Sequence, residues 1–134
     1  MIHRTATDLA LVLEQDRPGV LALVLEAIGQ AGINLDGYAV IGGQLHVLTA
    51  DAKAARRVLE GAGCPVESEQ QVLVIDVEDR PRVAAGIFRR IADREVNVLF
   101  TYVATNNRIV IGADDVKRVA EVLSRPSANQ VEED

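Results

Sequence analysis

The chain has 134 residues, of which 49% are hydrophobic and 25% are charged, and its formal net charge is −6. This composition is typical of a globular protein, whereas the negative charge and an aromatic content of 3% argue against nucleic-acid binding. No apolar run approaches the roughly 20 residues needed to span a bilayer, and a single cysteine fits a reducing compartment. We therefore expect a cytoplasmic protein with no nucleic-acid and no membrane partner. One cysteine and two separated histidines predict no metal site, and no cofactor is expected.

The chain opens with an apolar run at residues 9–13, which predicts a buried strand. Asp16 is then expected to be a helix N-cap, with Pro18 in the first helical turn. Apolar residues recur at helical spacing from Val20 to Ala31, and Gly32 is a typical helix-ending residue. The apolar arc of this helix is wide, so part of it is expected to meet another chain.

A hairpin follows the first helix. A strand beginning at Ile33 and a returning strand ending at Thr49 flank a turn at Gly42-Gly43. Asp51 is expected to cap a second helix over residues 52–61. A weaker apolar segment at 65–69 predicts a fourth strand at a sheet edge.

The second half repeats this order. A strand is predicted at residues 72–77, and Asp79 is expected to cap a helix whose inner face runs from Val83 to Ile91. A hairpin around Asn106-Asn107 comes next, and Asp114 opens a last helix. The matching final strand is short or missing, because the segment 126–134 is polar and is expected to be disordered.

Three landmarks recur at a constant spacing of 63 residues, which indicates an internal duplication. The pairs are Asp16 with Asp79, Asn34 with Asn97, and Asp51 with Asp114. We expect one domain over residues 8–70 and a second over 71–125. The predicted fold class is α+β, with two tandem ferredoxin-like βαββαβ units that have antiparallel sheets and both helices on one face. The open face must be covered, so pairing between halves and a homodimer are expected.

The pattern resembles the ACT domain family. A strand followed by Asp-Arg-Pro-Gly-Val at residues 16–20, an amphipathic helix and Gly-Ile-Asn-Leu at 32–35 carry the resemblance. The second half repeats it with Asp-Arg-Pro-Arg-Val at 79–83 and Glu-Val-Asn-Val at 95–98. The resemblance covers roughly residues 8 to 125. It implies a regulatory module that binds a small ligand, most often an amino acid, between paired domains, with the loop of one and the strand start of its partner enclosing the ligand.

The chemistry of the loop is consistent with this resemblance. A helix N-terminus presents free N–H groups that suit a carboxylate, and Gly19 allows close backbone approach. Asp16 is suited to accept a hydrogen bond from an ammonium group, and the Asn34 amide offers both a donor and an acceptor. Asn34 is expected at the same end of the sheet as the loop. The residues predicted to bind ligand are Asp16, Arg17, Gly19, Val20, Asn34 and Leu35 in the first half, with Asp79, Arg82 and Asn97 in the second.

Simpler roles stand beside these. Asp16 and Asp79 are also suited to be caps alone, and Asn34 and Asn97 to tie loop backbone together. Arg82 replaces the glycine of the motif, and its side chain either crowds the second pocket or reaches a ligand carboxylate. The first loop is therefore the better candidate.

Three functions fit the sequence. The first is an amino-acid-binding regulatory protein without catalysis, which is not an enzyme and acts on an enzyme or regulator encoded elsewhere. The second is a protein-interaction adaptor with vestigial pockets, favoured by the wide apolar arc. The third is an acylphosphatase-like hydrolase, in which Arg17 and Asn34 would form the site, although the glycine-rich phosphate loop is absent.

Overall fold

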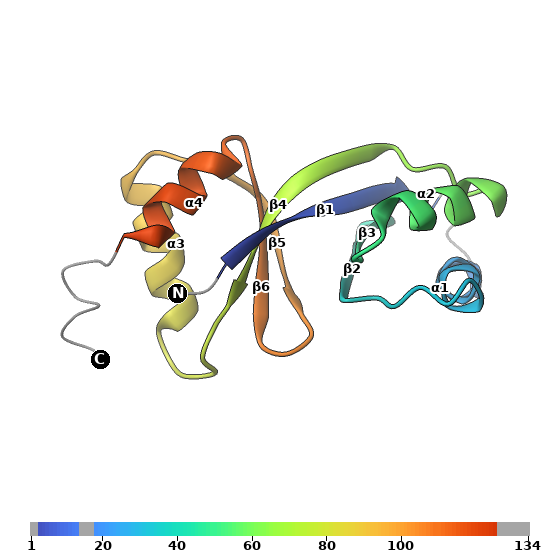
Figure 1. Cartoon of the computed structure of the whole chain (residues 1–134), viewed down its shortest axis with the longest axis horizontal. Helices are drawn as coiled ribbons and strands as arrows, with labels where there is room; N and C mark the ends of the chain where they lie inside the picture. Colours follow the sequence, from blue (N-terminus) through green and yellow to red (C-terminus); the bar gives the residue numbers. More distant parts are fainter. Residues whose placement is uncertain (1–2, 14–17, 126–134) are drawn as a thin grey trace. The chain divides into compact units, whose positions relative to one another are not determined.

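The computed structural model describes residues 3–13 and 18–125. This part of the chain contains six strands and four helices (Figure 1). In chain order they are β1 (His3–Val12), α1 (Val20–Gln30), β2 (Gly37–Ile41), β3 (Gln44–Leu48), α2 (Ala52–Gly61), β4 (Ser68–Asp76), α3 (Val83–Asp93), β5 (Val98–Ala104), β6 (Arg108–Ala113) and α4 (Val116–Ser124). The strands form a sheet in the order β2-β3-β1-β4-β6-β5. The predicted α+β class with antiparallel strands is confirmed.

The described residues fall into two compact units. The first unit comprises residues 6–71, and the second comprises residues 3–5 together with 72–125. Each has two helices between its strands, as a ferredoxin-like fold requires. The boundary lies within β1 and β4, and both strands are longer than the apolar runs that predicted them. In the second unit the beginning of β1 takes the place of the final strand that the sequence leaves short or missing.

The core of the first unit lies between one sheet face and its helices. Leu9 pairs with Val47 and Leu11 with Leu45, so these four apolar side chains share a face. They pack against buried residues of α1, α2 and the segment before β4, namely Val24, Ile28, Ala55, Leu59 and Val66. Both helices therefore cover the same face of the sheet.

The second unit repeats this packing. Leu73 pairs with Ile111 and Ile75 with Ile109, and these side chains face the helices. The helical side of the core consists of Ile87 and Ile91 from α3 with Val119 and Leu123 from α4. Buried apolar residues of this size contribute about 1.5–3 kcal/mol each, so both units have a substantial core.

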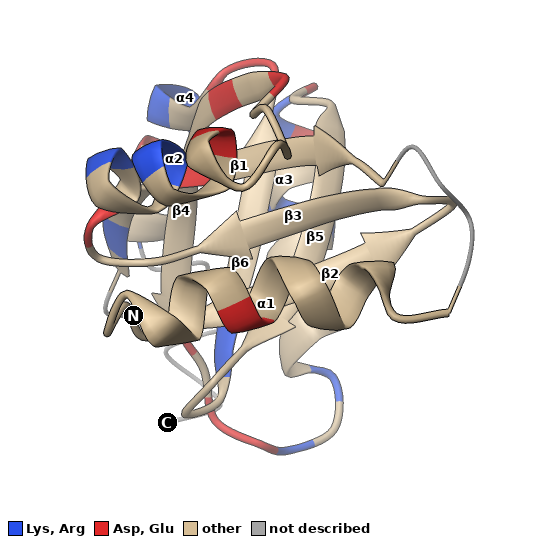
Figure 2. Ribbon diagram, turned by 90° about the vertical axis from the view of Figure 1, so that its right-hand side faces the viewer, with Lys and Arg blue, Asp and Glu red and all other residues tan. Residues whose placement is uncertain are grey.

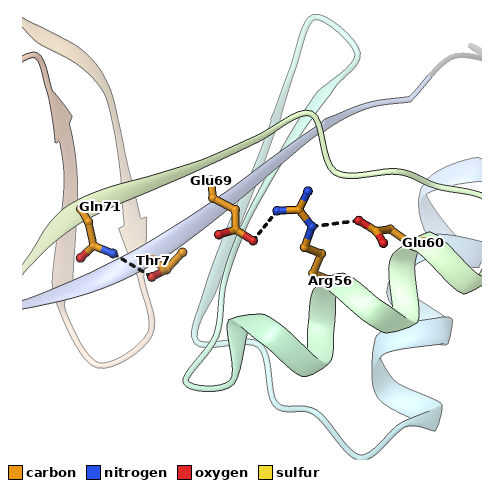
Figure 3. Close-up of polar contacts among 5 residues, drawn as sticks. All are labelled: Thr7, Arg56, Glu60, Glu69 and Gln71. Atoms are coloured by element: carbon orange, nitrogen blue, oxygen red, sulfur yellow. Dashed lines mark hydrogen bonds and ion pairs between the residues drawn. The ribbon is translucent and has the colours of Figure 1, made fainter.

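Polar contacts fix β4 at its beginning, as Figure 3 shows. Arg56 of α2 binds Glu69 of β4 at 2.6 Å and Glu60 one helical turn away at 2.8 Å. The hydrogen bond to Glu69, followed by that to Glu60, raises the pKa of Arg56 above its ordinary value. Gln71 donates a hydrogen bond to the Thr7 hydroxyl at 3.1 Å. These contacts are exposed, and each contributes little to stability.

Backbone conformation repeats between the halves more closely than the sequence does. Gly19 and Arg82 both have positive φ, at 91° and 74°, and so do Gly32 and Glu95, at 76° and 59°. Gly19 and Gly32 flank α1, and Arg82 and Glu95 flank α3 in the same way. Non-glycine residues adopt this left-handed region at an energetic cost. Arg82 and Glu95 therefore keep the backbone conformation that glycines adopt at the equivalent positions of the first unit.

The third repeated pair predicted from the sequence, Asp51 with Asp114, is wrong by one residue. The hairpin turn is Gly42-Gly43 in the first unit, whereas residues 105–107 connect β5 to β6, so the second turn is one residue longer. The equivalent of Asp51 is therefore Asp115, which caps α4 by accepting a hydrogen bond from the Arg118 N–H at 3.1 Å. The prediction that Asp51 caps α2 is correct, since its side chain accepts from the Ala54 N–H.

Candidate ligand-binding site

The N-terminus of α1 has no side-chain cap at its N-cap residue. That residue is Gly19, with φ 91° and ψ −13°, and α1 begins at Val20. The expectation that Asp16 is the N-cap is therefore wrong, and Pro18 lies before the helix rather than in its first turn. Asp16 and Arg17 lie outside the described residues. The left-handed Gly19 directly precedes the first helical residue, so the cap position falls on the glycine itself.

The N-terminus of α3 has the same geometry. Its N-cap is Arg82, with φ 74° and ψ −8° and no side-chain cap, so Asp79 is not the cap that the sequence predicts. No acidic residue lies in the first turn of either α1 or α3. By contrast, α2 and α4 are both capped by an aspartate. In each unit the N-cap of the second helix supplies a carboxylate, and the N-cap of the first helix does not. The N–H groups at the N-terminus of the first helix therefore present their partial positive charge without a carboxylate from that residue.

Replacing Arg82 with glycine should stabilise the protein by about 1 kcal/mol, because glycine adopts φ 74° without the strain that a side chain incurs. For a unit of this size the gain corresponds to a rise in melting temperature of roughly 4–8 °C. Urea denaturation would measure it. Arg82→Ala is the matched control, since it removes the long side chain and keeps the strain. An equal gain for both variants would contradict the strain explanation.

The other end of α1 borders a hollow of about 560 Å³ in the first unit. Asn34 lies here, exposed, and its amide donates to Asp36 Oδ1 at 3.2 Å. Its backbone carbonyl accepts a hydrogen bond from the buried Thr49 hydroxyl at 2.9 Å. The hollow is completed by residues just past the end of α1 and by residues of α2 and its N-cap, among them Asp51 and Arg57. Its lining therefore includes two aspartates, Asp36 and Asp51, and one arginine.

Asn97 holds the equivalent position in the second unit. Its N–H donates to Asp114 Oδ1 at 3.2 Å, and its carbonyl accepts from the Asp114 N–H at 3.2 Å. Asp114 therefore fixes this loop instead of opening α4. Leu35 is half-buried and packs against the core of the first unit. Both asparagine loops are therefore held through the backbone of the asparagine, by the side chains of Thr49 and Asp114.

The predicted site residues do not converge within one unit. Leu13, just past the end of β1, bonds to Gly43 at the hairpin turn, whereas Asn34 bonds to Thr49 beyond the opposite end of β3. The two groups are separated by α1, whose 11 residues span about 16 Å. The expectation that Asn34 lies at the same end of the sheet as the loop is therefore wrong. A crossover helix that follows one strand and precedes another parallel to it always separates its two loops in this way.

Sequence reasoning also missed several polar residues. Asp36 and Arg57 line the hollow, and only the two-residue spacing from Asn34 to Asp36 gave any signal. His46 is mostly buried, and its Nδ1 lies 2.8 Å from Oδ2 of the buried Asp8. These pairs join residues 21 to 38 positions apart, so no local pattern reveals them.

Solved structures share this architecture. Protein BT0572 from Bacteroides thetaiotaomicron superposes with a TM-score of 0.74 at 22% identity, covering 91% of this chain and 87% of that one. The ligand-free regulatory subunit of aspartate kinase from Thermus thermophilus gives 0.63 at 21% identity, covering 91% and 94%. That from Thermus flavus gives 0.67 at 19% identity, covering 92% and 94%.

The chain shares the fold of aspartate kinase regulatory subunits. This shared fold agrees with the resemblance found in the sequence. No protein-family model and no curated protein matches the chain. Within residues 3–13 and 18–125, no cluster of histidine, cysteine and acidic residues is arranged to hold a metal ion. Nor is any described helix both long and apolar enough to cross a membrane.

Proposed function

We propose that this protein is a regulatory module that binds a free amino acid and has no catalytic site of its own. The hollow beside Asn34 is the observation that carries the proposal, because it offers Asp36 to an ammonium group and Arg57 to a carboxylate. Its volume of about 560 Å³ suits a small molecule. The likeness to aspartate kinase regulatory subunits over nearly their whole length supports a role in regulation.

The uncapped loop at Gly19 completes the proposed site from a second copy of the chain. Within one unit, α1 keeps Gly19 and Asn34 apart, so one loop and one hollow meet only if two units contribute. The N–H groups of the first turn of α1 would then bind the ligand carboxylate. Asp16, Arg17 and Val20 belong to the same proposed contact, with Leu35 behind Asn34. In the second half, Asp79, Arg82 and Asn97 hold the corresponding positions, with an arginine in place of the glycine of the first loop.

The exposed apolar residues of β2 support a homodimer. β2 is an edge strand, and its Tyr38 and Ile41 are 51% and 73% exposed. Edge strands with apolar side chains pair readily with another chain. Binding that depends on two copies would couple ligand concentration to assembly, which gives a regulator its output.

The test is a thermal-melting screen with each of the twenty amino acids at 10 mM. We expect one or a few to raise the melting temperature by several degrees, because a ligand at 100 times its Kd adds about 2.7 kcal/mol. Gly19→Arg should abolish the response, since it copies the second loop and places a long side chain at the site. Sedimentation velocity on the same samples should show dimers when the active amino acid is present.

Gly19→Ala is the matched control for backbone strain. A methyl group at Gly19 meets no atom within 4 Å, so this variant has the strain of a non-glycine residue without blocking the loop. It should keep the response. If no amino acid shifts the melting temperature of the natural chain, the proposal fails. If instead the chain captures an enzyme or regulator regardless of added amino acids, the adaptor function is correct.

A further inference from the structure

The loops at Asn34 and Asn97 differ in one hydrogen bond. In the second unit the Asn97 backbone N–H donates to Asp114 Oδ1 at 3.2 Å. In the first unit the Asn34 backbone N–H makes no hydrogen bond to any group within residues 3–13 and 18–125. The same position of the two loops therefore holds a carboxylate oxygen in one unit and offers its N–H to a partner from outside in the other.

One difference in sequence accounts for this. Asp51 and Asp115, the N-caps of the second helices, are equivalent, so the residues that precede them are equivalent as well. These residues are Ala50 in the first unit and Asp114 in the second. Alanine has no side-chain group that can accept a hydrogen bond. Ala50 and Asn34 both line the hollow of about 560 Å³, so the place that the Asp114 carboxylate takes in the second unit corresponds to part of the hollow in the first.

The charged groups of the hollow suit a bound carboxylate. Both aspartates in its lining already have partners, since Asp51 Oδ1 caps α2 and Asp36 Oδ1 accepts a hydrogen bond from the Asn34 side chain. Figure 2 shows basic positions on α2, and Arg57 is the one that lines the hollow. Its neighbour Arg56 is bound to two glutamates, whereas Arg57 has no ion pair within the described part of the chain. A guanidinium group binds a carboxylate through two parallel hydrogen bonds.

The second unit lacks this basic group. The sixth residue of α2 is Arg57, and the sixth residue of α4 is Glu121. A carboxylate from outside would therefore find Asp114 already bound to the asparagine N–H and an acidic residue in place of the arginine. Because like charges repel, the second unit suits its own carboxylate and no other.

We propose that the Asn34 N–H and the Arg57 guanidinium form a carboxylate subsite in the first unit, and that Asp114 occupies the corresponding subsite of the second. For the nature of its ligand this assignment rests on the proposed function, and it fixes how the amino acid lies there. One carboxylate oxygen accepts from Asn34, which leaves the other for the first turn of α1 from a second copy. The second unit takes no ligand at this place while Asp114 is present.

Sodium acetate and its neutral isostere acetamide test the subsite without any amino acid. In nitrogen–proton correlation spectra at constant ionic strength, acetate should move the Asn34 amide proton downfield in a saturable manner, at least threefold farther than acetamide does. The Asn97 amide should respond to neither compound. No acetate shift at Asn34, or an equal shift with acetamide, would overturn the assignment even if an amino acid raises the melting temperature. A saturable acetate shift without a thermal response to any amino acid would uphold the subsite and refute the proposed function alone.

Ala50→Asp gives the first unit the carboxylate of the second. The Asn34 amide proton should move downfield before any acetate is added, and its response to acetate should be lost, because the new side chain takes the place of the ligand. Arg57→Gln should keep the unshifted Asn34 signal and weaken the apparent affinity for acetate severalfold. An acetate response that is unchanged in Ala50→Asp would refute the proposal.

The reverse exchange opens the second unit. Asp114→Ala combined with Glu121→Arg should give the Asn97 amide the acetate response that Asn34 has in the natural chain. Asp93→Ala, which removes an exposed carboxylate elsewhere in the second unit, is the control and should leave the Asn97 amide unresponsive. If the Asn97 amide responds in the control, or fails to respond in the double variant, Asp114 is not what closes the second subsite.

Discussion

Replacing Gly112 with alanine should destabilise the protein by about 2–3 kcal/mol, which is typical of overpacking in a tightly packed region. Gly112 is buried on β6 and pairs with Phe100 of β5. A Cβ atom there would lie 2.8 Å from Phe100 Cε1 and nearer still to Cζ and Cε2. The Phe100 ring in turn stacks on Tyr102, with ring centroids 6.2 Å apart and an interplanar angle of 12°. Moving the ring away from Gly112 would alter this stack.

A double-mutant cycle with Phe100→Ala would isolate the clash. In the Phe100→Ala background the ring is gone, so Gly112→Ala should cost less than about 1 kcal/mol. Urea denaturation of the four proteins gives the coupling energy. If the two substitutions prove additive, the ring is not the reason that position 112 requires glycine.

Replacing His46 with alanine should cost about 2–3 kcal/mol at pH 7. Asp8 is 1% exposed, and its carboxyl group loses the hydrogen bond from His46, whose Nδ1 lies 2.8 Å away. Removing one partner of a buried polar pair costs the desolvation of the group that remains. The loss should appear in urea denaturation as a lower midpoint with an unchanged slope.

The second histidine provides the control. His3 is hydrogen-bonded to the exposed Ser124 hydroxyl at 2.9 Å, so His3→Ala should change stability by less than about 0.5 kcal/mol. Asp8→Asn in the His46→Ala background should recover part of the loss, because a neutral amide is less costly to bury than a carboxylate. Equal effects of the two histidine substitutions would show that burial of the Asp8–His46 pair is not what matters.

The fold could be predicted from the sequence because its signals are local. Apolar runs marked the strands, helical spacing marked the helices, and the Asp51 cap was found from a residue type at a helix start. The two-residue turn at Gly42-Gly43 follows from the conformational freedom of glycine. The second turn was harder, because Asn106 and Asn107 both adopt positive φ in a three-residue connection. Its extra residue moves the counterpart of Asp51 from the predicted Asp114 to Asp115.

The site could be predicted only in part. The motif identified both loops, but the conformation of Gly19 moves the helix start past Asp16 and Pro18. Which end of the sheet Asn34 occupies depends on the crossover through α1, which sequence spacing does not reveal. The hollow needs Asp36 and Arg57 from separate elements.

The participation of residues 3–5 in the second unit has a consequence for biosynthesis. These residues leave the ribosome before the strand that they border, β4, and before the helices of that unit. Until β4 has been synthesised, residues 3–5 lack their neighbouring strand, while the earlier elements of the first unit are already available to fold. Expression of the distal half as a fragment would leave one flank of β4 bare, and that flank would be open to association between nascent chains.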